Sequence, residues 1–454
     1  MLLPLTFHLE PVSGLIMLAG IFYGAQYGGS TTAILVNLPG ETSSVVTCID
    51  GHQMARQGRA GSALAIAALG SFFAGTVATA IIATFAPPLA KVGQSFGAPE
   101  YFSLMLLGLI SAIVLAHGSI IKAVAMVIFG LLFGLVGTDG NTGGQRFTFG
   151  LITLADGIGF VPVAVGVFGV GEIIMNLVGH EEKRSVVMAR ITRLWPTREE
   201  FHQAWPAVLR GTALGSVLGV LPGGGATLSS FAAYVFEKKI ARDPSRFGKG
   251  AIEGVAGPES ANNAGAQTSF IPMLTLGIPG NAVMALMIGA LTIHGIQPGP
   301  QVMTERPSLF WGMVASMWIG NLMLVVINLP LIGIWVQLLK VPYRLLYLAI
   351  LLFCAIGVYS VNNNAFEVVL TALFGVLGYV FIKLDCEPAP MVLGFILGPM
   401  MEENLRRAMM ISFGDPTVLI TRPISAGFLF AALALLIAIA LPALRAKREE
   451  AMQE

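Results

Sequence analysis

Two short runs of this sequence place proline, glycine and oxygen-bearing side chains inside apolar stretches, where they could bind an ion. The first reads NLPGETSS over residues 37–44, and the second reads TLGIPGN over residues 275–281. Proline and glycine interrupt a helix, and the N–H and C=O groups freed at membrane depth are tolerated only inside protein or around a polar cavity. Two interrupted apolar segments at corresponding positions in two halves of a chain are typical of a transporter binding site.

A third run, LPGGGAT at residues 221–227, has the chemistry of an anion site. A helix N-terminus carries about half a positive charge and unpaired N–H donors. Glycines let that backbone approach an anion closely, and neighbouring hydroxyl groups add donors. An anionic substrate could thus be held with few permanent cations in the membrane. The substrate-binding residues that we predict are Pro39, Gly40, Thr42, Ser43, Ser44, Gly223, Gly224, Gly225, Thr227, Pro279 and Gly280.

Carbonyl oxygens freed by the same breaks, together with nearby amide and hydroxyl oxygens, are suitable ligands for a small cation. For any one of these residues, a hydrogen bond that packs two helices is the competing explanation. Glu41 could serve as a cation ligand or as a proton carrier, so the pattern leaves Na⁺ and H⁺ open. The ion-coupling residues that we predict are Asn37, Glu41, Asn262, Asn263, Thr275 and Asn281.

The composition is that of an integral membrane protein. Hydrophobic residues make up 55% and charged residues 11% of the chain, and the mean hydropathy is +0.78, whereas soluble domains carry roughly 25% charged residues. Because a spanning helix needs roughly 20 apolar residues, we expect an all-α fold with about ten to twelve membrane segments. The uncharged runs lie at 11–40, 60–90, 101–121, 123–138, 157–171, 211–236, 260–304, 307–339, 345–366, 368–382, 388–401 and 423–444.

Basic loops stay in the cytoplasm, which orients the chain. The polar stretches at 180–206 and 238–249 are both rich in Lys and Arg, so the uncharged residues 211–236 must leave and return on the same side. They are too short for two crossings of about 20 residues each, so we predict a re-entrant hairpin with LPGGGAT at its tip. The loop carrying Arg56 and Arg59 is then inside and the loop 291–306 outside, which inverts the two halves relative to each other, as is common in secondary transporters.

This topology divides the chain into four parts. We expect a first membrane repeat at 1–179, a cytoplasmic basic linker at 180–206, a second repeat at 207–400, and a C-terminal membrane segment with a basic tail at 401–454. The first repeat should be shortened at its N-terminus, because the counterpart of Pro222 would fall before Met1. The N-terminus also lacks the basic region and cleavage site of a signal peptide.

Other polar residues allow two explanations each. Residues 134–150 are either an ordinary polar loop or a gate or clasp formed by Asp139 and Arg146. Glu172 lies among apolar residues, where an ionisable group is a functional hypothesis, whereas His117 is expected to cap a turn. The cysteines Cys48, Cys354 and Cys386 lack the spacing of a metal or disulfide framework. We predict no metal site, no cofactor beyond the coupling ion, and no nucleic-acid binding.

Four signatures make the chain resemble the large membrane subunit of the tripartite tricarboxylate transporters of bacteria, over nearly its whole length. The signatures are AGIFYGAQYGGSTTAILVNLPGETSSVVTCIDGHQMARQGRAG, GTDGNTGGQRFTFG, GVLPGGGATLSSFAAYVFEKK and GKGAIEGVAGPESANNAGAQTSFIPMLTLGIPGNAVMALMIGALTIHGIQPGP. The resemblance implies a multi-pass symporter of the inner membrane that works with a small membrane subunit and a periplasmic solute-binding protein. It implies citrate or another organic acid anion as substrate, driven by Na⁺ or H⁺.

An anion channel without ion coupling is the alternative, and it would need neither an ion gradient nor a binding protein. An enzyme is not indicated, because the chain contains no HExxH motif. An ATP-driven pump is not indicated either, since Gly248-Lys249 lacks the Walker spacing.

Overall fold

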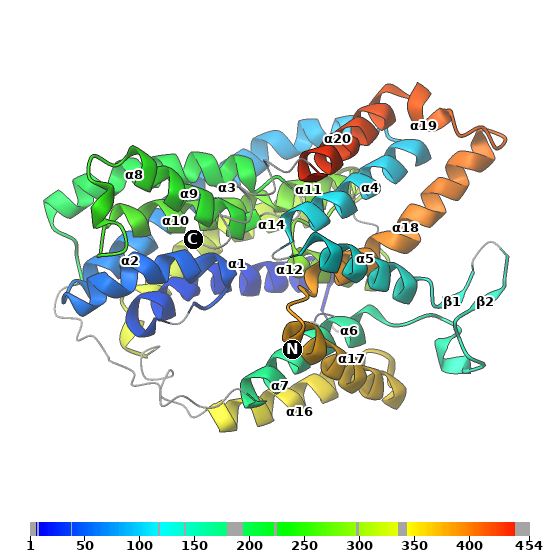
Figure 1. The fold of residues 1–454 in the computed structure, drawn as a ribbon, viewed down its shortest axis with the longest axis horizontal. Coiled ribbons are helices and arrows are strands. Elements are labelled where there is room, and N and C mark those ends of the chain that lie inside the picture. Colours follow the sequence, from blue (N-terminus) through cyan, green and yellow to red (C-terminus); the bar gives the residue numbers. More distant parts are fainter. Residues whose placement is uncertain are drawn as a thin grey trace.

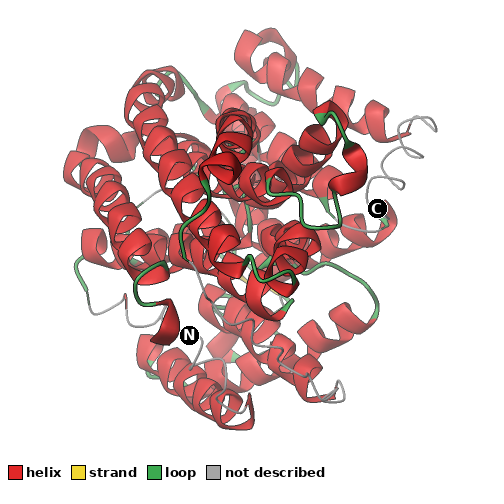
Figure 2. Ribbon diagram, turned by 90° about the vertical axis from the view of Figure 1, so that its left-hand side faces the viewer, coloured by secondary structure: helices red, strands yellow, loops and turns green. Residues whose placement is uncertain are grey.

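The computed structural model describes residues 6, 9–37, 39–116, 119–139, 142–178, 194–221, 225–296, 299–334 and 343–440. Helices make up most of this part of the chain (Figures 1 and 2). The α-helices are α1 (Pro11–Val36), α2 (Val45–Arg56), α3 (Ala60–Gly93), α4 (Ala98–Leu115), α5 (Ile120–Gly134), α6 (Phe160–Ala164), α7 (Gly171–Val178), α8 (Arg198–Leu218), α9 (Gly225–Ile240), α10 (Glu253–Thr268), α11 (Phe270–Leu276), α12 (Ala282–Ile293), α13 (Gln301–Glu305), α14 (Pro307–Asn328), α16 (Tyr343–Asn362), α17 (Ala365–Lys383), α18 (Ala389–Ile411), α19 (Val418–Thr421) and α20 (Pro423–Ala440).

The helices are those of an all-α membrane protein, as predicted. Four of them in the described part are long and apolar enough to cross a membrane, namely α3, α14, α17 and the continuous segment Phe160–Val178, in which a π-helix at Val165–Val170 joins α6 to α7. Shorter apolar helices accompany them, and α4 and α5 are separate, as the sequence indicates. On α14 the side chains of Ile319 and Leu322 are about 60% exposed, at 62% and 58%, which suits a face in contact with lipid.

Helix α3 defines the two ends of the molecule. It has 34 residues and is therefore about 51 Å long. At its start, Arg59 Nε donates to Glu200 Oε1 at 2.8 Å. At its end, a Cβ added to Gly93 would lie 3.1 Å from the ring of Pro300. We call these the Arg59 end and the Pro300 end.

A hairpin formed by α8 and α9 packs on α10 (Figure 1). The chain doubles back after Leu218, and Arg210 on α8 pairs with Glu237 on α9 at 2.6 Å. Against α10 the α8 helix presents a glycine every fourth residue. A Cβ on any of these glycines would overlap the backbone of residue 257, 261 or 265, so only small residues permit this approach. The glycines are Gly211, Gly215 and Gly219.

The last part of the expected linker at 180–206 is helical. Residues 198–206 are the first turns of α8, because Thr197 Oγ1 accepts a hydrogen bond from Glu200 N at 3.1 Å and Glu200 Oε2 accepts one from Thr197 N at 2.8 Å. This reciprocal capping starts a helix within a polar stretch. The sequence Thr-Arg-Glu-Glu carried that signal. Residues 180–193 lie outside the described part of the chain.

Two further crossings depend on close backbone contact at glycines. Helix α5 packs on α18, where a Cβ added to Gly130 would overlap the carbonyl oxygen of Met391. Helix α17 packs on the segment 160–178, where a Cβ on Gly171 would lie 3.1 Å from the backbone of Gly378. Close packing therefore accounts for many of the glycines.

The polar loop after α5 is held by ion pairs between side chains. It forms a short antiparallel hairpin in which β1 (Gly137–Thr138) pairs with β2 (Gln145–Arg146). Arg146 forms an ion pair with Asp139 and a second one with Glu402 on α18, at 3.0 Å. The predicted contact between Asp139 and Arg146 is confirmed, and the ion pair between Arg146 and Glu402 attaches the loop to α18 as a clasp.

Candidate functional site

The first interruption, between α1 and α2, has a defined backbone. Asn37 adopts the left-handed conformation with φ 54°, and its N–H donates to Thr32 O, which ends α1. Glu41 is extended, with φ −146°. Its backbone N–H donates to Ser44 Oγ at 3.3 Å, while that hydroxyl donates to Glu41 O at 2.9 Å. We call residues 37–44 the first break.

The second interruption, between α11 and α12, follows the same course. Gly277 is left-handed with φ 72° and ends α11, and Asn281 is extended with φ −161°. Asn281 Oδ1 accepts a hydrogen bond from Met284 N at 2.9 Å and so caps α12. In each case a left-handed residue precedes the extended capping residue by four positions. We call residues 277–281 the second break.

The helices that follow the two breaks end at opposite ends of the molecule. Helix α2 ends at the Arg59 end, where Gln57 Nε2 donates to Lys249 O at 2.8 Å. Helix α12 ends at the Pro300 end, where His294 Nε2 lies 3.1 Å from Thr6 O. The loop carrying Arg59 and the loop carrying Lys249 thus share one end, which is the arrangement that the positive-inside argument predicts for two cytoplasmic loops.

The first turn of α9 lies beside both breaks. Thr227 Oγ1 is 2.8 Å from Thr42 Oγ1 of the first break. On the other side, a Cβ added to Gly225 would lie 3.5 Å from Asn281 Nδ2 and 3.8 Å from Gly280 O. The structure therefore brings three of the predicted runs together at one helix N-terminus. Gly223 and Gly224, with Pro222, lie outside the described residues.

Exposure separates the predicted substrate-binding residues. Pro39, Gly40 and Thr42 are exposed, whereas Pro279 and Gly280 are buried. The buried hydroxyl groups of the first break already have partners, since Ser43 Oγ donates to Gln26 Oε1 at 2.7 Å and Ser44 Oγ donates to Glu41 O. The geometry thus gives Ser43 and Ser44 a part in shaping the break, and it leaves Thr42 and the backbone of residues 39–40 accessible.

Three of the predicted ion-coupling residues gather around one face of α10. Asn262 Nδ2 donates to Gln26 O at 3.3 Å, and Gln26 also accepts from Ser43, which in turn lies 3.4 Å from Glu41 Oε1. Asn263 Nδ2 donates to Ser71 Oγ at 2.6 Å. Within the described residues, the buried oxygens Glu41 Oε2, Asn262 Oδ1 and Asn263 Oδ1 have no hydrogen-bond partner. Unpaired buried oxygens are costly, and a cation or proton would satisfy them.

The other predicted ion-coupling residues lie elsewhere. Thr275 is buried and its hydroxyl donates to Ile271 O at 2.6 Å within its own helix. Asn281 belongs to the second break, and Asn37 is exposed at the end of α1. Among the predicted ion-coupling residues that the structure describes, the oxygens that lack partners therefore belong to α10 and the first break.

Glu259 is a candidate site residue that the sequence analysis missed. It lies on α10 one turn before Asn262 and Asn263, is fully buried, and accepts a hydrogen bond from Thr47 Oγ1. Its Oε2 has no partner within the described residues. An ionisable residue in an apolar helix is a functional signal. Glu172 carries this signal because it lies among apolar residues, yet its side chain is exposed. Glu259 does not stand out in the sequence, because it lies at the border of the uncharged run 260–304 and not inside it.

Comparison with known proteins identifies relatives of the chain. A family model described as the tripartite tricarboxylate transporter TctA family matches residues 1–393. An Agrobacterium vitis protein described as an uncharacterized 52.8 kDa protein in the TAR-I ttuC' 3' region is 60% identical over 454 residues, which is all of this chain and 90% of that protein. A second Agrobacterium vitis protein, from the TAR-II ttuC' 3' region, is 60% identical over 240 residues, 53% of this chain and 99% of its own length. No solved structure matches.

Proposed function

Because the chain belongs to the tripartite tricarboxylate transporter TctA family, we propose that it is the large permease subunit of a secondary transporter for organic acid anions. The substrates are tricarboxylates or related carboxylates, and a Na⁺ or H⁺ gradient drives their uptake. A small membrane subunit and a periplasmic solute-binding protein complete the transporter, which lies in the inner membrane of a bacterium. The word tripartite in the family description supports this set of partners.

The observation that carries the proposal is the position of the α9 N-terminus between the two breaks. Gly225 begins α9 with φ 41°. In the first turn of α9, Thr227 contacts Thr42 of the first break, and Gly225 lies beside Asn281 of the second break. A helix N-terminus favours a carboxylate through its dipole and its N–H donors. Exposed Thr42 adds a hydroxyl donor. This is a site for an anion that needs no fixed cation.

Two features support an inverted repeat. The breaks share one backbone course, and the helices after them run to opposite ends, α2 to the Arg59 end and α12 to the Pro300 end. The helix pairs that pack closely at glycines also occur twice: α5 packs on α18, and α17 packs on the segment 160–178. Inverted halves with a broken helix each allow a site to open to one side or the other.

Ion coupling is assigned to Glu41 and Glu259 with the amide oxygens of α10. Asn262 on α10 donates to Gln26 O and Ser43 of the first break donates to Gln26 Oε1, so Gln26 links α10 to the break that contains Glu41. Since the first break also contacts α9 through Thr42, occupation of these oxygens by Na⁺ or H⁺ would hold the break in the conformation that binds the anion. Coupling of this kind is a difference in affinity between two states.

The test is uptake of labelled citrate, with a panel of di- and monocarboxylates, by cells that contain the chain. The two partner subunits are supplied or withheld, and the Na⁺ and H⁺ gradients are collapsed one at a time. Uptake that requires the partners and one gradient supports the proposal and identifies the ion. Uptake that is indifferent to both would instead indicate a channel, and a chain that transports none of the acids would contradict the substrate class.

A further inference from the structure

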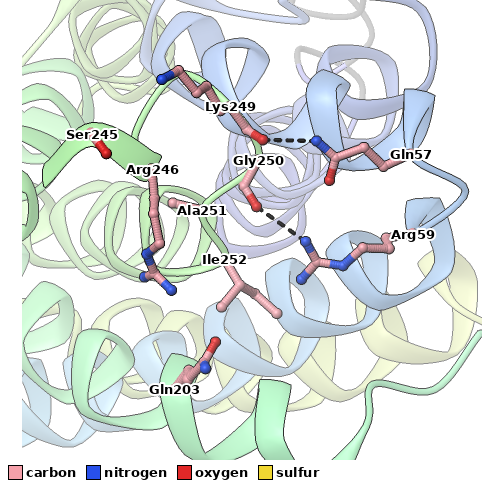
Figure 3. A pocket seen from close by; sticks show the side chains of 9 residues that line it. All are labelled: Gln57, Arg59, Gln203, Ser245, Arg246, Lys249, Gly250, Ala251 and Ile252. Atoms are coloured by element: carbon pink, nitrogen blue, oxygen red, sulfur yellow. Dashed lines mark hydrogen bonds between the residues drawn. The ribbon is translucent and has the colours of Figure 1, made fainter. Parts of the chain in front are cut away.

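A basic cavity lies at the Arg59 end, away from the two breaks. Its volume is about 310 Å³, within the range of small-molecule sites. Figure 3 shows side chains from three parts of the chain around it: the turn between α2 and α3, the N-terminal half of α8, and the connection between α9 and α10. The lining residues are Gln57, Arg59, Gln203, Ser245, Arg246, Lys249, Gly250, Ala251 and Ile252.

The wall of the cavity is fixed by a buried carboxylate behind it. Asp50 Oδ1 accepts hydrogen bonds from the N–H groups of Gly250 and Ala251, both at 2.8 Å, and Asp50 Oδ2 accepts one from Tyr234 Oη at 2.9 Å. On the outer side, Arg59 Nη1 donates to Gly250 O at 3.2 Å. The loop is therefore held in place by contacts within the protein, and a preformed site loses little ordering entropy when it binds a ligand.

The lining is positively charged. Arg59, Arg246 and Lys249 line the cavity, and no acidic side chain does so within the described residues. Arg59 forms an ion pair with Glu200 at 2.8 Å and Arg246 forms one with Glu253 at 2.5 Å. Lys249 forms no ion pair within 4 Å in that part of the chain, although the pKa of the nearby Asp243 carboxyl is lowered by hydrogen bonds from Ser245 and also by the charges of Arg246 and Lys249. An arginine has five N–H donors, so both guanidinium groups keep donors for a ligand.

The cavity is separate from the site at the breaks. Helix α2 connects the two, and its 12 residues correspond to about 18 Å. The cavity also joins the two halves, since Arg59 belongs to the first and Arg246 and Lys249 to the second. A compact anion in it would contact both halves at once, at the end that the basic loops predict to be cytoplasmic.

We propose that this cavity is a second anion site, which takes a compact di- or trianion from the cytoplasm and slows transport when it is occupied. Arg246 and Arg59 bind the oxygens of a carboxylate or phosphate group, as guanidinium groups do in bidentate pairs, and Lys249 adds a charge. An anion that bridges the halves stabilises the conformation in which they are close and so opposes their relative motion. The effect on transport rests on the proposed function, whereas the binding does not.

Binding is measured by calorimetry on the purified full chain in detergent, with citrate, succinate and inorganic phosphate as probes. The test variant carries R246Q and K249Q, and the control is R242Q, which removes a charge from the same connection outside the cavity. We expect at least a tenfold loss of affinity for one of these anions in the test variant and none in the control. Equal affinity in the wild type and the test variant would overturn the proposal, provided both melt at the same temperature.

Two further measurements are needed. The first distinguishes a lipid headgroup from a free anion as the ligand, and the second distinguishes the second anion site from the proposed transport function. Nanodiscs with and without phosphatidylglycerol show whether a lipid headgroup occupies the cavity, and binding to that lipid alone, with no free anion, would contradict a cytoplasmic ligand. In vesicles loaded with the bound anion, uptake by the wild type should be slower than uptake by the test variant. If no variant transports any acid but the calorimetric difference remains, the proposed function fails and the second site stands.

Discussion

The hydroxyl oxygen of Thr42 lies 2.8 Å from the hydroxyl oxygen of Thr227. This hydrogen bond joins residues 185 positions apart, one in the first break and one in the first turn of α9. Any movement of the break relative to α9 must lengthen or break it. Substitution of this pair therefore tests whether the first break and the N-terminus of α9 form one site.

Substitution of either threonine by valine should remove this hydrogen bond while keeping the side-chain shape. We expect each single variant, T42V and T227V, to lose about 0.5–1.5 kcal/mol of stability, and the double variant to lose no more than the larger single loss. The coupling is measured by a double-mutant cycle on chemical unfolding.

The control for this cycle is T84V, because Thr84 is exposed on α3 and its hydroxyl donates to Ala80 O in its own helix. Additive losses in T42V and T227V would mean that the two hydroxyl groups do not interact in solution. The same variants in the uptake assay show whether the pair also affects the Michaelis constant for the anion.

A side chain at Gly29 on α1 should displace the carboxylate of Glu41. A Cβ on Gly29 would overlap the carboxylate of Glu41, and a Cβ on Gly40 would lie 2.6 Å from Gly29 Cα. We expect G29A to displace the first break, to destabilise the protein by about 1–3 kcal/mol, and to abolish uptake. Melting temperature and uptake are measured together.

Gly20 provides the matched control in the same helix, since a Cβ there would meet nothing within 4 Å. G20A should therefore keep both stability and uptake, with the small helix-propensity gain of alanine over glycine. If G29A transports as well as G20A, then Glu41 does not pack against α1 as described.

The breaks could be predicted from the sequence because their signals are local. Proline and glycine both disfavour a helix interior, and the shared pattern around Pro39 and Pro279 gives two copies of the same signal. Composition alone predicted the membrane helices, and the long motifs predicted the family, which is confirmed. Both kinds of inference need no knowledge of which helices are neighbours.

Contacts between distant segments could not be read in this way. Nothing in the sequence places Thr42 beside Thr227, because that contact depends on how α8 and α9 pack on α10 through Gly211, Gly215 and Gly219. Glu259 was missed for a related reason. It stands between a polar loop and an apolar run, and only the packing of α10 decides that it is buried.

Neutralising Glu259 should alter ion coupling if this carboxyl group holds the cation or proton. We expect E259Q to shift the half-saturating Na⁺ concentration of uptake, or the midpoint of its pH profile, by at least tenfold, because glutamine keeps the shape but not the charge. T47V, which removes the hydroxyl that donates to Glu259, should produce a smaller shift in the same direction. Uptake is measured across Na⁺ concentrations and pH values.

E199Q is the control for the loss of one carboxyl group, because Glu199 is exposed at the start of α8. A parallel E41Q variant separates the two carboxyl groups of the proposed coupling site. If E259Q keeps the Na⁺ and pH dependence of the wild type while E41Q changes it, then Glu259 has only a structural part and Glu41 alone carries the coupling.

The ion pair between Arg59 and Glu200 should make stability depend on pH. Burial raises the pKa of the Glu200 carboxyl, but hydrogen bonds from Thr197 N, Arg59 and Ser62 outweigh it, so the pKa lies below its ordinary value. In the unfolded chain the Glu200 carboxyl has its ordinary pKa of about 4.3. At pH values between the folded pKa and this ordinary pKa, the unfolded chain therefore binds more protons than the folded chain. The contribution to stability is fully present above that pH and is lost as the pH falls through the folded pKa.

We expect E200Q to lower the free energy of unfolding at pH 7 by about 0.2–1 kcal/mol through loss of the ion pair, because a glutamine at this position can keep the capping contacts of α8. The difference in melting temperature between wild type and E200Q should be largest at pH 7 and should shrink between pH 5 and pH 3. E199Q, which leaves both Arg59 and the cap intact, should show no such trend. A difference that stayed constant with pH would mean that the Glu200 carboxylate is not stabilised in the folded protein, and Arg59 would then be free to bind an anion in the cavity with its full charge.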